Sequence, residues 1–296
     1  MEETHTQPSD QEISIEELVD TKPELVLDRT AQEAVGQSAR NFRAALRTDI
    51  GLAREINEDS CLICSFDAGG HNPPVPFGLY LVADGMGGHD GGERASNVAS
   101  RTAAHYLLQQ VYLPLVRADI LPDPSVVETI LREAVQAAHE AVHPPGYEGN
   151  GGTTLTLAMI LGSVLYVAHV GDSRAYWLVE HTLQALTQDH SLVQRLQDSG
   201  KLTAEEAQDY QYRNVLLRAL GQAEELEVDV YIHELPARGR LLLCSDGLCG
   251  QVPGTELERI MNLPHLPDAI ADQLIAAALG AGGLDNISAI VVEFTP

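Results

Sequence analysis

The chain has 296 residues and a formal net charge of −25 at pH 7, from 43 acidic and 18 basic side chains. This length suits one large domain with a substantial buried core, and the net charge argues against nucleic acid, because an acidic surface repels phosphate backbones. Four cysteines are too few for a disulfide scaffold, and no apolar run is long enough to span a bilayer. We therefore expect a soluble cytoplasmic protein without membrane or nucleic-acid partners.

Residues 1–40 differ in composition from the rest of the chain. They contain ten acidic and three basic residues, a net charge of −7, which leaves −18 for the remainder. Low hydrophobicity with high charge favours disorder. We predict an acidic disordered tail over residues 1–40 and a folded domain over residues 41–296. Two short apolar pieces, residues 13–19 and 24–27, leave open an alternative in which the tail recruits a partner or regulates a site.

The folded domain begins with segments typical of strands. An extended segment at 43–48 precedes apolar runs at 60–66 and 79–83, and a loop rich in glycine and proline separates these two runs. We predict that the two runs form a hairpin with a long surface connection. Its strands would then present Asp59 and Asp84 at neighbouring ends.

Helices and then short strands are predicted in the middle of the chain. Residues 92–111 and 125–142 have apolar residues at helical spacing, and the second helix opens with Ser125 and Glu128 at the spacing of a capping box. Runs of β-branched and aromatic residues then predict strands at 153–161, 164–170, 174–179 and 183–186, with a tight turn at Gly162-Ser163. Consecutive short strands indicate antiparallel pairing.

The last third of the chain alternates between helices and strands. Asp189 is placed to cap a helix that ends at Gly200, and Thr203 is placed to start another. Strands are predicted at 228–235, 240–244 and 287–294, with a pair of helices near 255–258 and 267–279. Runs of strands interrupted by paired helices favour an α+β fold of stacked antiparallel sheets covered by helices. Acids at the strand ends would meet at one end of such a sandwich.

Acidic residues lie beside several apolar strands. Asp84 follows the run 79–83 and opens a stretch rich in glycine, which on its own is also typical of a simple turn. Carboxylates that converge raise each other's pKa unless a cation intervenes, so a meeting of Asp84, Asp246 and Asp285 predicts a metal. Oxygen ligands select Mg²⁺ or Mn²⁺, and several acids suit a two-metal centre that hydrolyses phosphoesters.

The cysteines are predicted to be buried structural thiols. Cys61 and Cys64 have the spacing of half a zinc site, but positions i and i+3 of a strand point to opposite faces. The other pair, Cys244 and Cys249, is separated by four residues and flanks an acid.

Six motifs occur in a recognisable order along residues 43–294. They are Arg54…Asn57-Glu58-Asp59, Asp84-Gly85-Met86-Gly87-Gly88-His89, Gly151-Gly152-Thr153-Thr154, Gly171-Asp172-Ser173-Arg174, Ser245-Asp246-Gly247 and Asp285-Asn286-Ile287-Ser288. This order resembles the metal-dependent PP2C family of serine/threonine protein phosphatases, particularly its compact bacterial members. The resemblance implies an αββα sandwich of two antiparallel sheets flanked by pairs of helices, with two Mn²⁺ or Mg²⁺ ions at one edge.

The resemblance also implies a set of metal ligands. Asp84 would bridge both ions, the Gly85 carbonyl would bind one of them, and Asp246 and Asp285 would bind the other. Asp172, together with Asp246, matches the position of a third, weaker ion in bacterial relatives. Two further acids would act mainly through coordinated waters; they are Glu58 and Asp59.

Two other residues resemble the family's catalytic groups. Arg54 resembles the residue that grips the substrate phosphate, and His89 resembles the general acid that protonates the leaving seryl or threonyl oxygen. Plainer alternatives remain open: a surface ion pair of Arg54 with Glu55 or Glu58, an exposed loop histidine at position 89, and an Asx turn at Asp172.

The chain also departs from the family pattern. The segment 210–214 lacks the His-Pro pair that many bacterial relatives carry before Arg213-Asn214, in a region that resembles the family's mobile flap, and Gly250 stands where relatives often have an acid. These changes bear on substrate preference. We expect a monomeric phosphatase for phosphoserine and phosphothreonine in proteins, one that opposes a kinase. Two alternatives are a phosphatase for small phosphoesters and an inactive binding module of the same fold.

Overall fold

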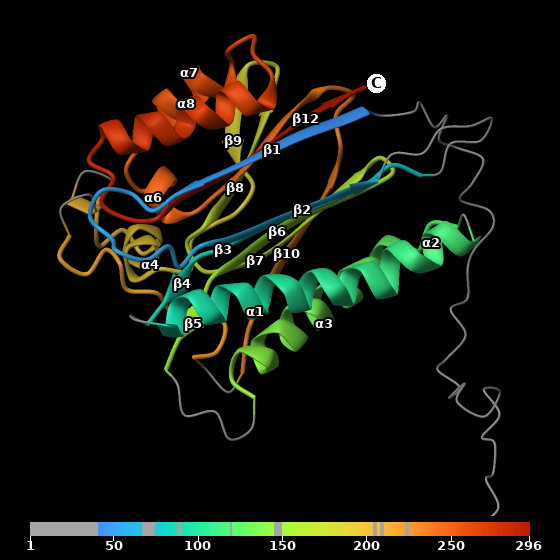
Figure 1. The fold of residues 1–296 in the computed structure, drawn as a ribbon, viewed down its shortest axis with the longest axis horizontal. Helices are drawn as coiled ribbons and strands as arrows, with labels where there is room; N and C mark the ends of the chain where they lie inside the picture. Colours follow the sequence, from blue (N-terminus) through green and yellow to red (C-terminus); the bar gives the residue numbers. More distant parts are fainter. Residues whose placement is uncertain are drawn as a thin grey trace, which may run out of the picture. The chain divides into compact units, whose positions relative to one another are not determined.

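Two five-stranded antiparallel sheets lie face to face in this computed structural model (Figure 1). The first sheet contains, in spatial order, β1 (Asn41–Asp49), β12 (Ile287–Thr295), β11 (Gly239–Cys244), β8 (Arg174–Val179) and β9 (Thr182–Ala185). The second contains β10 (Asp229–Glu234), β7 (Val164–Val170), β6 (Leu155–Leu161), β3 (Phe77–Ala83) and β2 (Ser60–Phe66). The structure describes residues 41–66, 75–87, 90–118, 120–144, 150–203, 206–207, 210–222 and 225–296. The predicted tail, residues 1–40, lies outside these ranges.

Helices cover the outer face of each sheet. On the second sheet lie α1 (Asp90–Leu107), which continues through the π-helical turn η3 (Leu108–Tyr112) into α2 (Leu113–Ala118), and α3 (Pro124–Val142). On the first sheet lie α7 (Gly254–Met261) and α8 (Pro267–Gly280). The predicted α+β sandwich with helix, sheet, sheet and helix layers is confirmed. None of the helices in the described residues has the length and hydropathy of a membrane span.

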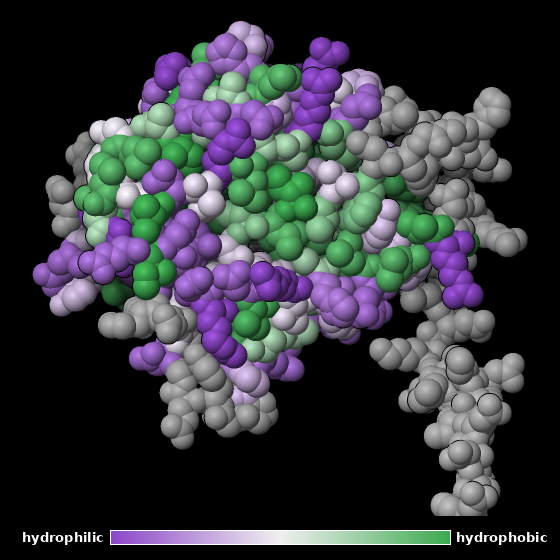
Figure 2. Space-filling model, viewed as in Figure 1, coloured by the Kyte–Doolittle hydropathy of each residue, from purple (hydrophilic) through white to green (hydrophobic). Residues whose placement is uncertain are grey.

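The side-chain alternation of β3 shows how the layers are held together. Leu79 and Leu81 pack against α1 and α3, whereas Tyr80 and Val82 pack between the two sheets. Both faces of this central strand are buried, which explains its continuous apolar run. At one open side of the sandwich, Figure 2 shows apolar surface over the edge strands β1 and β2, where residues such as Phe42 are only partly buried.

Several predicted strands are confirmed to the residue. The runs 60–66, 164–170 and 174–179 are β2, β7 and β8. The predicted hairpin is also confirmed, because β2 and β3 pair antiparallel with Ser60 opposite Ala83. β3 begins at Phe77, two residues earlier than the prediction.

The capping box predicted at Ser125 and Glu128 is wrong for α3, whereas the helix start predicted at Thr203 does form a capping box. The N-cap of α3 is Asp123, whose Oδ1 accepts a hydrogen bond from Ser125 N at 2.8 Å, and Pro124 occupies the first helical turn. By contrast, Thr203 N donates to Glu206 Oε2 at 2.9 Å while Glu206 N donates to Thr203 Oγ1 at 3.2 Å. These two reciprocal bonds form a capping box.

The predicted cap of the next helix is also wrong. The helix α4 (Leu192–Asp198) is capped by Ser191, whose Oγ accepts from Gln194 N at 3.2 Å. Asp189 instead forms two hydrogen bonds of 2.7 Å with the Arg174 guanidinium. The pair with Arg174 has two parallel hydrogen bonds between two charged groups, whereas a cap would pair the carboxylate with a neutral backbone amide, so the carboxylate turns toward β8.

All four cysteines are free thiols. The prediction of buried thiols is confirmed for Cys244 and Cys249, whereas Cys61 and Cys64 are only partly buried. Cys61 packs between the sheets, whereas Cys64 packs on the side of α1 and α3. Burial raises the pKa of Cys61 to about 12, which keeps it a neutral thiol. Cys244 and Cys249 are both buried against α7 and α8.

Candidate metal centre

The β2–β3 hairpin brings the first two predicted acids to one end of the second sheet. Asp59 immediately precedes β2 and Asp84 immediately follows β3, at the end where Ser60 pairs with Ala83. The backbone of Asp84 is held from both sides, since its N–H donates to Thr154 Oγ1 and its carbonyl accepts from Thr154 N, both at 2.9 Å. Thr154, which directly precedes β6, therefore fixes the backbone from which the Asp84 carboxylate projects.

Gly85 allows the chain to pass close to Glu58. Gly85 N donates to the Glu58 carbonyl at 3.2 Å, and a Cβ on Gly85 would lie 2.3 Å from Gly92 O and 2.5 Å from Glu58 O. Only glycine fits this space. The short β4 (Gly85–Met86) then pairs antiparallel with β5 (Gly152–Thr153), with Gly85 opposite Thr153.

Asn286 joins the loop of Glu58 to the loop of Asp285. Its Oδ1 accepts from Glu58 N at 2.8 Å, and its Nδ2 donates to the carbonyls of Ile50 and Ile56, both at 3.0 Å. The sequence indicated no role for Asn286 beyond its place in the motif Asp285-Asn286-Ile287-Ser288, directly before β12.

Ser245 connects the two sheets at the same end. Its Oγ donates to Asp59 Oδ2 at 2.8 Å and accepts from Ser288 N at 3.0 Å. It directly precedes the short helix α6 (Asp246–Cys249), which begins with the predicted ligand Asp246. A Cβ on Gly247 would lie 2.0 Å from Asn286 O, so α6 packs directly against the loop of Asp285. Sequence reasoning missed the positioning role of Ser245.

The turn between β7 and β8 supplies Asp172. Gly171 has a φ of +115°, and a Cβ there would lie 2.5 Å from Thr154, so the turn requires glycine. Ser173 Oγ lies 2.8 Å from Thr154 Oγ1. Thr154 therefore contacts both the Asp84 backbone and the turn that carries Asp172.

Burial and mutual repulsion disfavour the charged forms of these acids. Burial, with the charges of Asp246 and others nearby, raises the pKa of Asp172 to about 8. Burial likewise raises the pKa of Asp59 to about 7, although the Ser288 and Ser245 hydrogen bonds lower it. The pKa of Asp84 is raised well above its ordinary value by burial and then by the charge of Asp59. Such a cluster is stable in its ionised form only beside a positive charge.

The donor set fits a divalent cation. Within the described part of the chain, three buried carboxylate oxygens have no hydrogen-bond partner: Glu58 Oε1, Asp59 Oδ1 and Asp246 Oδ1. Buried oxygens without partners are rare in folded proteins and are commonly explained by a bound ion or water. Carboxylate and carbonyl oxygens are the ligands of Mg²⁺ and Mn²⁺.

In the described residues, the acids do not surround one point as the ligands of a bound ion would. No three of these residues' acidic, histidine or cysteine side chains are grouped around one point as ligands of an ion. Arg54 explains why Asp285 is not grouped with the other acids, because its Nη2 lies 2.6 Å from Asp285 Oδ2. The pairing is with Asp285 and not with Glu55 or Glu58, the two surface partners that the sequence left open. A guanidinium therefore supplies the positive charge at Asp285.

A cleft of about 630 Å³ opens beside the acids. Its lining includes Arg54, Asp172, Asp246 and Asp285. One wall comes from described residues of the stretch 191–217, which we call the flap segment; among them are Gln194, Arg213 and Asn214. The segment without the His-Pro pair thus lines the cleft. Gly250 lies in the same lining, and its N–H donates to the Asp246 carbonyl at 2.6 Å.

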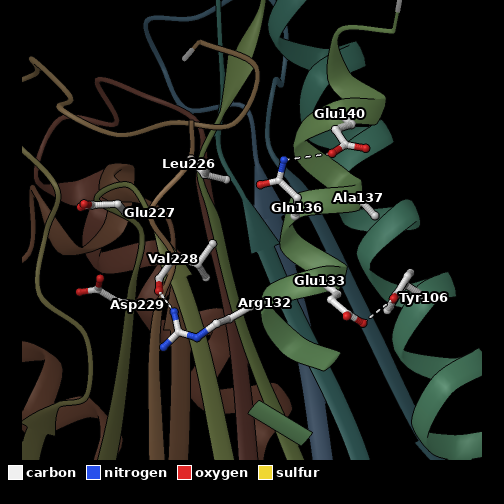
Figure 3. Close-up of a pocket in the computed structure, with 10 residues that line it drawn as sticks. All are labelled: Tyr106, Arg132, Glu133, Gln136, Ala137, Glu140, Leu226, Glu227, Val228 and Asp229. Carbon is white, nitrogen blue, oxygen red and sulfur yellow. Dashed lines mark hydrogen bonds between the residues drawn. The ribbon is translucent and has the colours of Figure 1, made fainter. Parts of the chain in front are cut away.

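A second cavity, of about 740 Å³, shares no residue with the carboxylate cluster. It lies between α3 and residues 226–229, and Figure 3 shows the Tyr106 hydroxyl pointing at Glu133, 2.7 Å away. Arg132 crosses this cavity to the Val228 carbonyl. Its side chains already pair with one another, which makes it a weaker candidate site than the cleft. The remaining predicted site residue, His89, lies outside the described residues.

Comparisons with known proteins point to one family. A family model described as protein phosphatase 2C matches residues 54–274. The serine/threonine phosphatase stp of Listeria monocytogenes is 38% identical over 256 residues, which is 85% of this chain and 96% of that protein. The serine/threonine protein phosphatase PstP of Mycobacterium tuberculosis is 36% identical over 257 residues, which is 85% of this chain and 45% of that protein.

Solved structures show the same similarity. A crystal structure of the Mycobacterium tuberculosis phosphatase PstP/Ppp superimposes with a TM-score of 0.70 at 35% identity, over 86% of this chain and 99% of that one. The catalytic domain of PstP in complex with two manganese ions gives a TM-score of 0.68 at 34% identity, over 87% of this chain and 100% of that one.

Proposed function

Because this chain belongs to the protein phosphatase 2C family of metal-dependent serine/threonine protein phosphatases, we propose that its carboxylate cluster is the metal centre of that reaction. The enzyme hydrolyses phosphoserine and phosphothreonine in proteins and uses Mn²⁺ or Mg²⁺ as its cofactor. The observation that carries the site assignment is the set of three unpaired buried oxygens, on Glu58, Asp59 and Asp246, at one end of the sandwich.

The proposed ligands follow the family's arrangement. Asp84 is proposed to contact both ions, with the Gly85 carbonyl on one and Asp246 and Asp285 on the other. A divalent ion held by these residues would supply a water of lowered pKa as the nucleophile and positive charge for the phosphoryl oxygens. Three further acids are proposed to complete the centre. Asp172 would bind a third, weaker ion, and Glu58 and Asp59 would act through coordinated waters.

Arg54 is proposed to bind the substrate phosphate. Its side chain is about half exposed, at 49%, and it lines the cleft next to the acids. A planar guanidinium donates two parallel hydrogen bonds to phosphate oxygens as readily as to a carboxylate. Substrate binding would therefore exchange the Asp285 carboxylate for the phosphate, which leaves Asp285 free to act as a ligand.

His89 is proposed as the general acid that protonates the leaving oxygen of serine or threonine. The support is its place in the motif that begins at Asp84. A neutral leaving alcohol departs more easily than an alkoxide, so loss of this proton donor would slow the release of seryl and threonyl groups far more than that of an acidic phenol.

Further aspects of the biology are proposals as well. We propose phosphoproteins modified by a serine/threonine kinase as substrates, a monomeric state and a cytoplasmic location. The acidic tail, residues 1–40, is proposed as a recruiting or regulatory segment, and an unchanged activity and partner pull-down after its deletion would contradict that role. An inactive binding module is disfavoured, because Asp84, Asp246 and Asp285 are all present.

A comparison of substrates tests the protein-phosphatase assignment. Specificity constants should be measured with Mn²⁺ for a phosphothreonine peptide, for free phosphothreonine and for p-nitrophenyl phosphate. We expect a higher specificity constant for the peptide than for free phosphothreonine, because peptide residues on either side of the phosphothreonine would contact the cleft walls. Equal constants for both would support a phosphatase for small phosphoesters, and no release from any of the three would support a binding module.

A further inference from the structure

His190 stands at the base of the flap segment. Its backbone N–H donates to Gly171 O and its carbonyl accepts from Leu217 N, both at 2.7 Å. One residue further on, Leu192 N donates to Val215 O at 2.8 Å. The flap segment, residues 191–217, therefore leaves and rejoins the domain at His190, next to the turn that carries Asp172.

The His190 side chain makes a second contact with the same turn. The ring is buried, with 8% of the residue exposed, and its Nδ1 accepts a hydrogen bond from Gly171 N at 3.2 Å. An Nδ1 that accepts carries no proton, so the neutral ring is protonated at Nε2. Burial lowers the pKa of His190, and the Arg218 charge lowers it further, while Asp229 and Asp189 raise it.

Asp229 selects this tautomer. Its Oδ2 lies 3.3 Å from His190 Nε2, and its Oδ1 accepts from Arg218 Nη1 at 3.0 Å. Arg218 Nη1 also lies 3.2 Å from Nε2, but a guanidinium only donates and a protonated Nε2 cannot accept, so Asp229 Oδ2 is the acceptor for the Nε2 proton. Arg218 follows the flap segment directly, and Asp229 is the first residue of β10. One imidazole thus connects the start of β10 and the residue after the flap segment to Gly171.

We propose that His190 is a positioning residue, which holds the Asp172 turn and the base of the flap segment in one arrangement by accepting from Gly171 N and donating to Asp229. The structural part of this inference stands on the hydrogen bonds alone. Its consequence for catalysis rests on the proposed function, in which Asp172 is a metal ligand and the flap segment contacts the substrate.

Two substitutions separate the two contacts of the ring. In His190→Asn the side-chain oxygen replaces Nδ1 at the same number of bonds from the backbone, so the bond from Gly171 N is kept and the contact with Asp229 is lost. In His190→Gln the longer side chain reaches the position of Nε2, so Asp229 keeps a donor and Gly171 N loses its acceptor.

Amide hydrogen exchange in the absence of metal gives a readout that does not depend on turnover. We expect the Gly171 amide to exchange at least about tenfold faster in His190→Gln than in the wild type, and to stay within about threefold in His190→Asn, because exchange reports the local opening free energy. Equal exchange of Gly171 in both variants would show that the ring acts only by filling space and would overturn the proposal.

His139 offers a matched control. It is also buried, at 7% exposed, and its Nδ1 accepts from a glycine amide, Gly221 N, at 3.0 Å. His139→Gln should lower the melting temperature and leave the exchange of Gly171 unchanged. If it accelerates Gly171 exchange as much as His190→Gln does, the effect is a general loss of stability and the proposal fails.

Two measurements test the consequence for catalysis. Calorimetric titration with Mn²⁺ measures the dissociation constant of the site with the lowest affinity. This constant should be higher in His190→Gln than in His190→Asn. In His190→Gln, KM should rise several-fold for a phosphothreonine peptide and less for p-nitrophenyl phosphate, since only the peptide is long enough to contact the flap segment.

If Gly171 exchange separates the variants while the wild type shows no phosphatase activity, the proposed function fails and the positioning role stands. If exchange separates them while both keep wild-type Mn²⁺ binding and KM, the catalytic part of the proposal is contradicted.

Discussion

The hydroxyl of Ser245 donates to the carboxylate of Asp59 across 2.8 Å, and this bond joins the acid-bearing ends of the two sheets. Ser245 is fully buried and its oxygen also accepts from Ser288 N. Asp59 comes from the hairpin of the second sheet, and Ser245 follows β11 of the first sheet. The carboxylate cluster is therefore assembled where the sheets are tied together, so folding and metal binding depend on the same contacts.

The first prediction concerns this bond. Ser245→Ala leaves Asp59 Oδ2 and the Ser288 amide without their partner, so we expect a loss of about 1–3 kcal/mol in the free energy of unfolding, as is usual for buried groups left unsatisfied. Urea unfolding with chelator present measures this loss. Ser65→Ala, at an exposed position of β2, is the control and should change stability by less than about 0.5 kcal/mol. A Ser245→Ala protein as stable as the control would contradict the role assigned to this hydroxyl.

The second prediction concerns phosphate binding by Arg54. Arg54→Ala should lower kcat/KM for a phosphothreonine peptide by about 10- to 100-fold, since hydrogen bonds to charged groups contribute about 1.5–3 kcal/mol. Stability should change little, because both side chains of the ion pair with Asp285 are partly exposed, at 49% and 28%. Steady-state kinetics with Mn²⁺ and a thermal melt check both statements.

Arg47→Ala is the matched control for Arg54→Ala. Arg47 also forms a 2.6 Å ion pair at the surface, with Asp272 of α8, but it lies outside the lining of the cleft. We expect wild-type kcat/KM for this variant. Equal loss of activity in both variants would show that removal of any surface arginine is harmful, and would contradict the assignment of Arg54.

The third prediction concerns Asn286. Its side chain is nearly buried, at 4% exposed, and makes three hydrogen bonds to the backbone of residues 50, 56 and 58. Asn286→Ala should lower the free energy of unfolding by about 2–4 kcal/mol, at roughly 1 kcal/mol for each bond. It should also weaken Mn²⁺ binding, because the loops of Glu58 and Asp285 lose their connection. Denaturation and calorimetry measure the two effects, and unchanged Mn²⁺ affinity would contradict the positioning role.

The fourth prediction concerns pH and metal removal. Carboxyl groups with an ordinary pKa of 3.8 titrate in the folded protein at about 7 for Asp59 and about 8 for Asp172. Between about pH 4 and 8 the metal-free folded protein therefore binds more protons than the unfolded chain, so its stability falls as pH rises through this window. Bound Mn²⁺ favours the ionised carboxylates and offsets this fall.

The difference in melting temperature between Mn²⁺-loaded and chelator-treated protein should therefore grow from pH 5 to pH 8. Melting curves across this range measure it. The Asp84→Asn protein, which lacks the proposed bridging carboxylate, should show a smaller difference at every pH. If the melting temperatures of the wild type with and without Mn²⁺ differ by the same amount at every pH, the coupling of metal binding to these acids is contradicted.

The local patterns of the chain predicted the strands and the first pair of acids. β2, β7 and β8 were predicted to the residue because apolar runs and turn residues mark their ends, and the β2–β3 hairpin placed Asp59 near Asp84. The cap of α3 was misplaced because Asp123 and Ser125 are both good capping residues two positions apart, and Pro124 at the first turn decides between them.

Other features depend on contacts between distant parts of the chain. β1 pairs with β12, Asn286 contacts Glu58 across 228 residues, and Ser245 contacts Asp59 across 186. Periodicity and spacing carry no information about such pairs. The meeting of the acids from both sheets was an expectation drawn from their place at strand ends and from the order of the motifs, and the polar residues that hold the acids in place became visible only in three dimensions.

The most direct test of the account is phosphate release from a phosphothreonine peptide with Mn²⁺, with Mg²⁺ and with excess chelator, for the wild type and for Asp84→Asn. The account predicts turnover by the wild type with either ion, none with chelator, and a loss of several orders of magnitude in Asp84→Asn that remains folded by circular dichroism. Wild-type turnover that persists in excess chelator, or folded wild type that releases no phosphate with either ion, would contradict it.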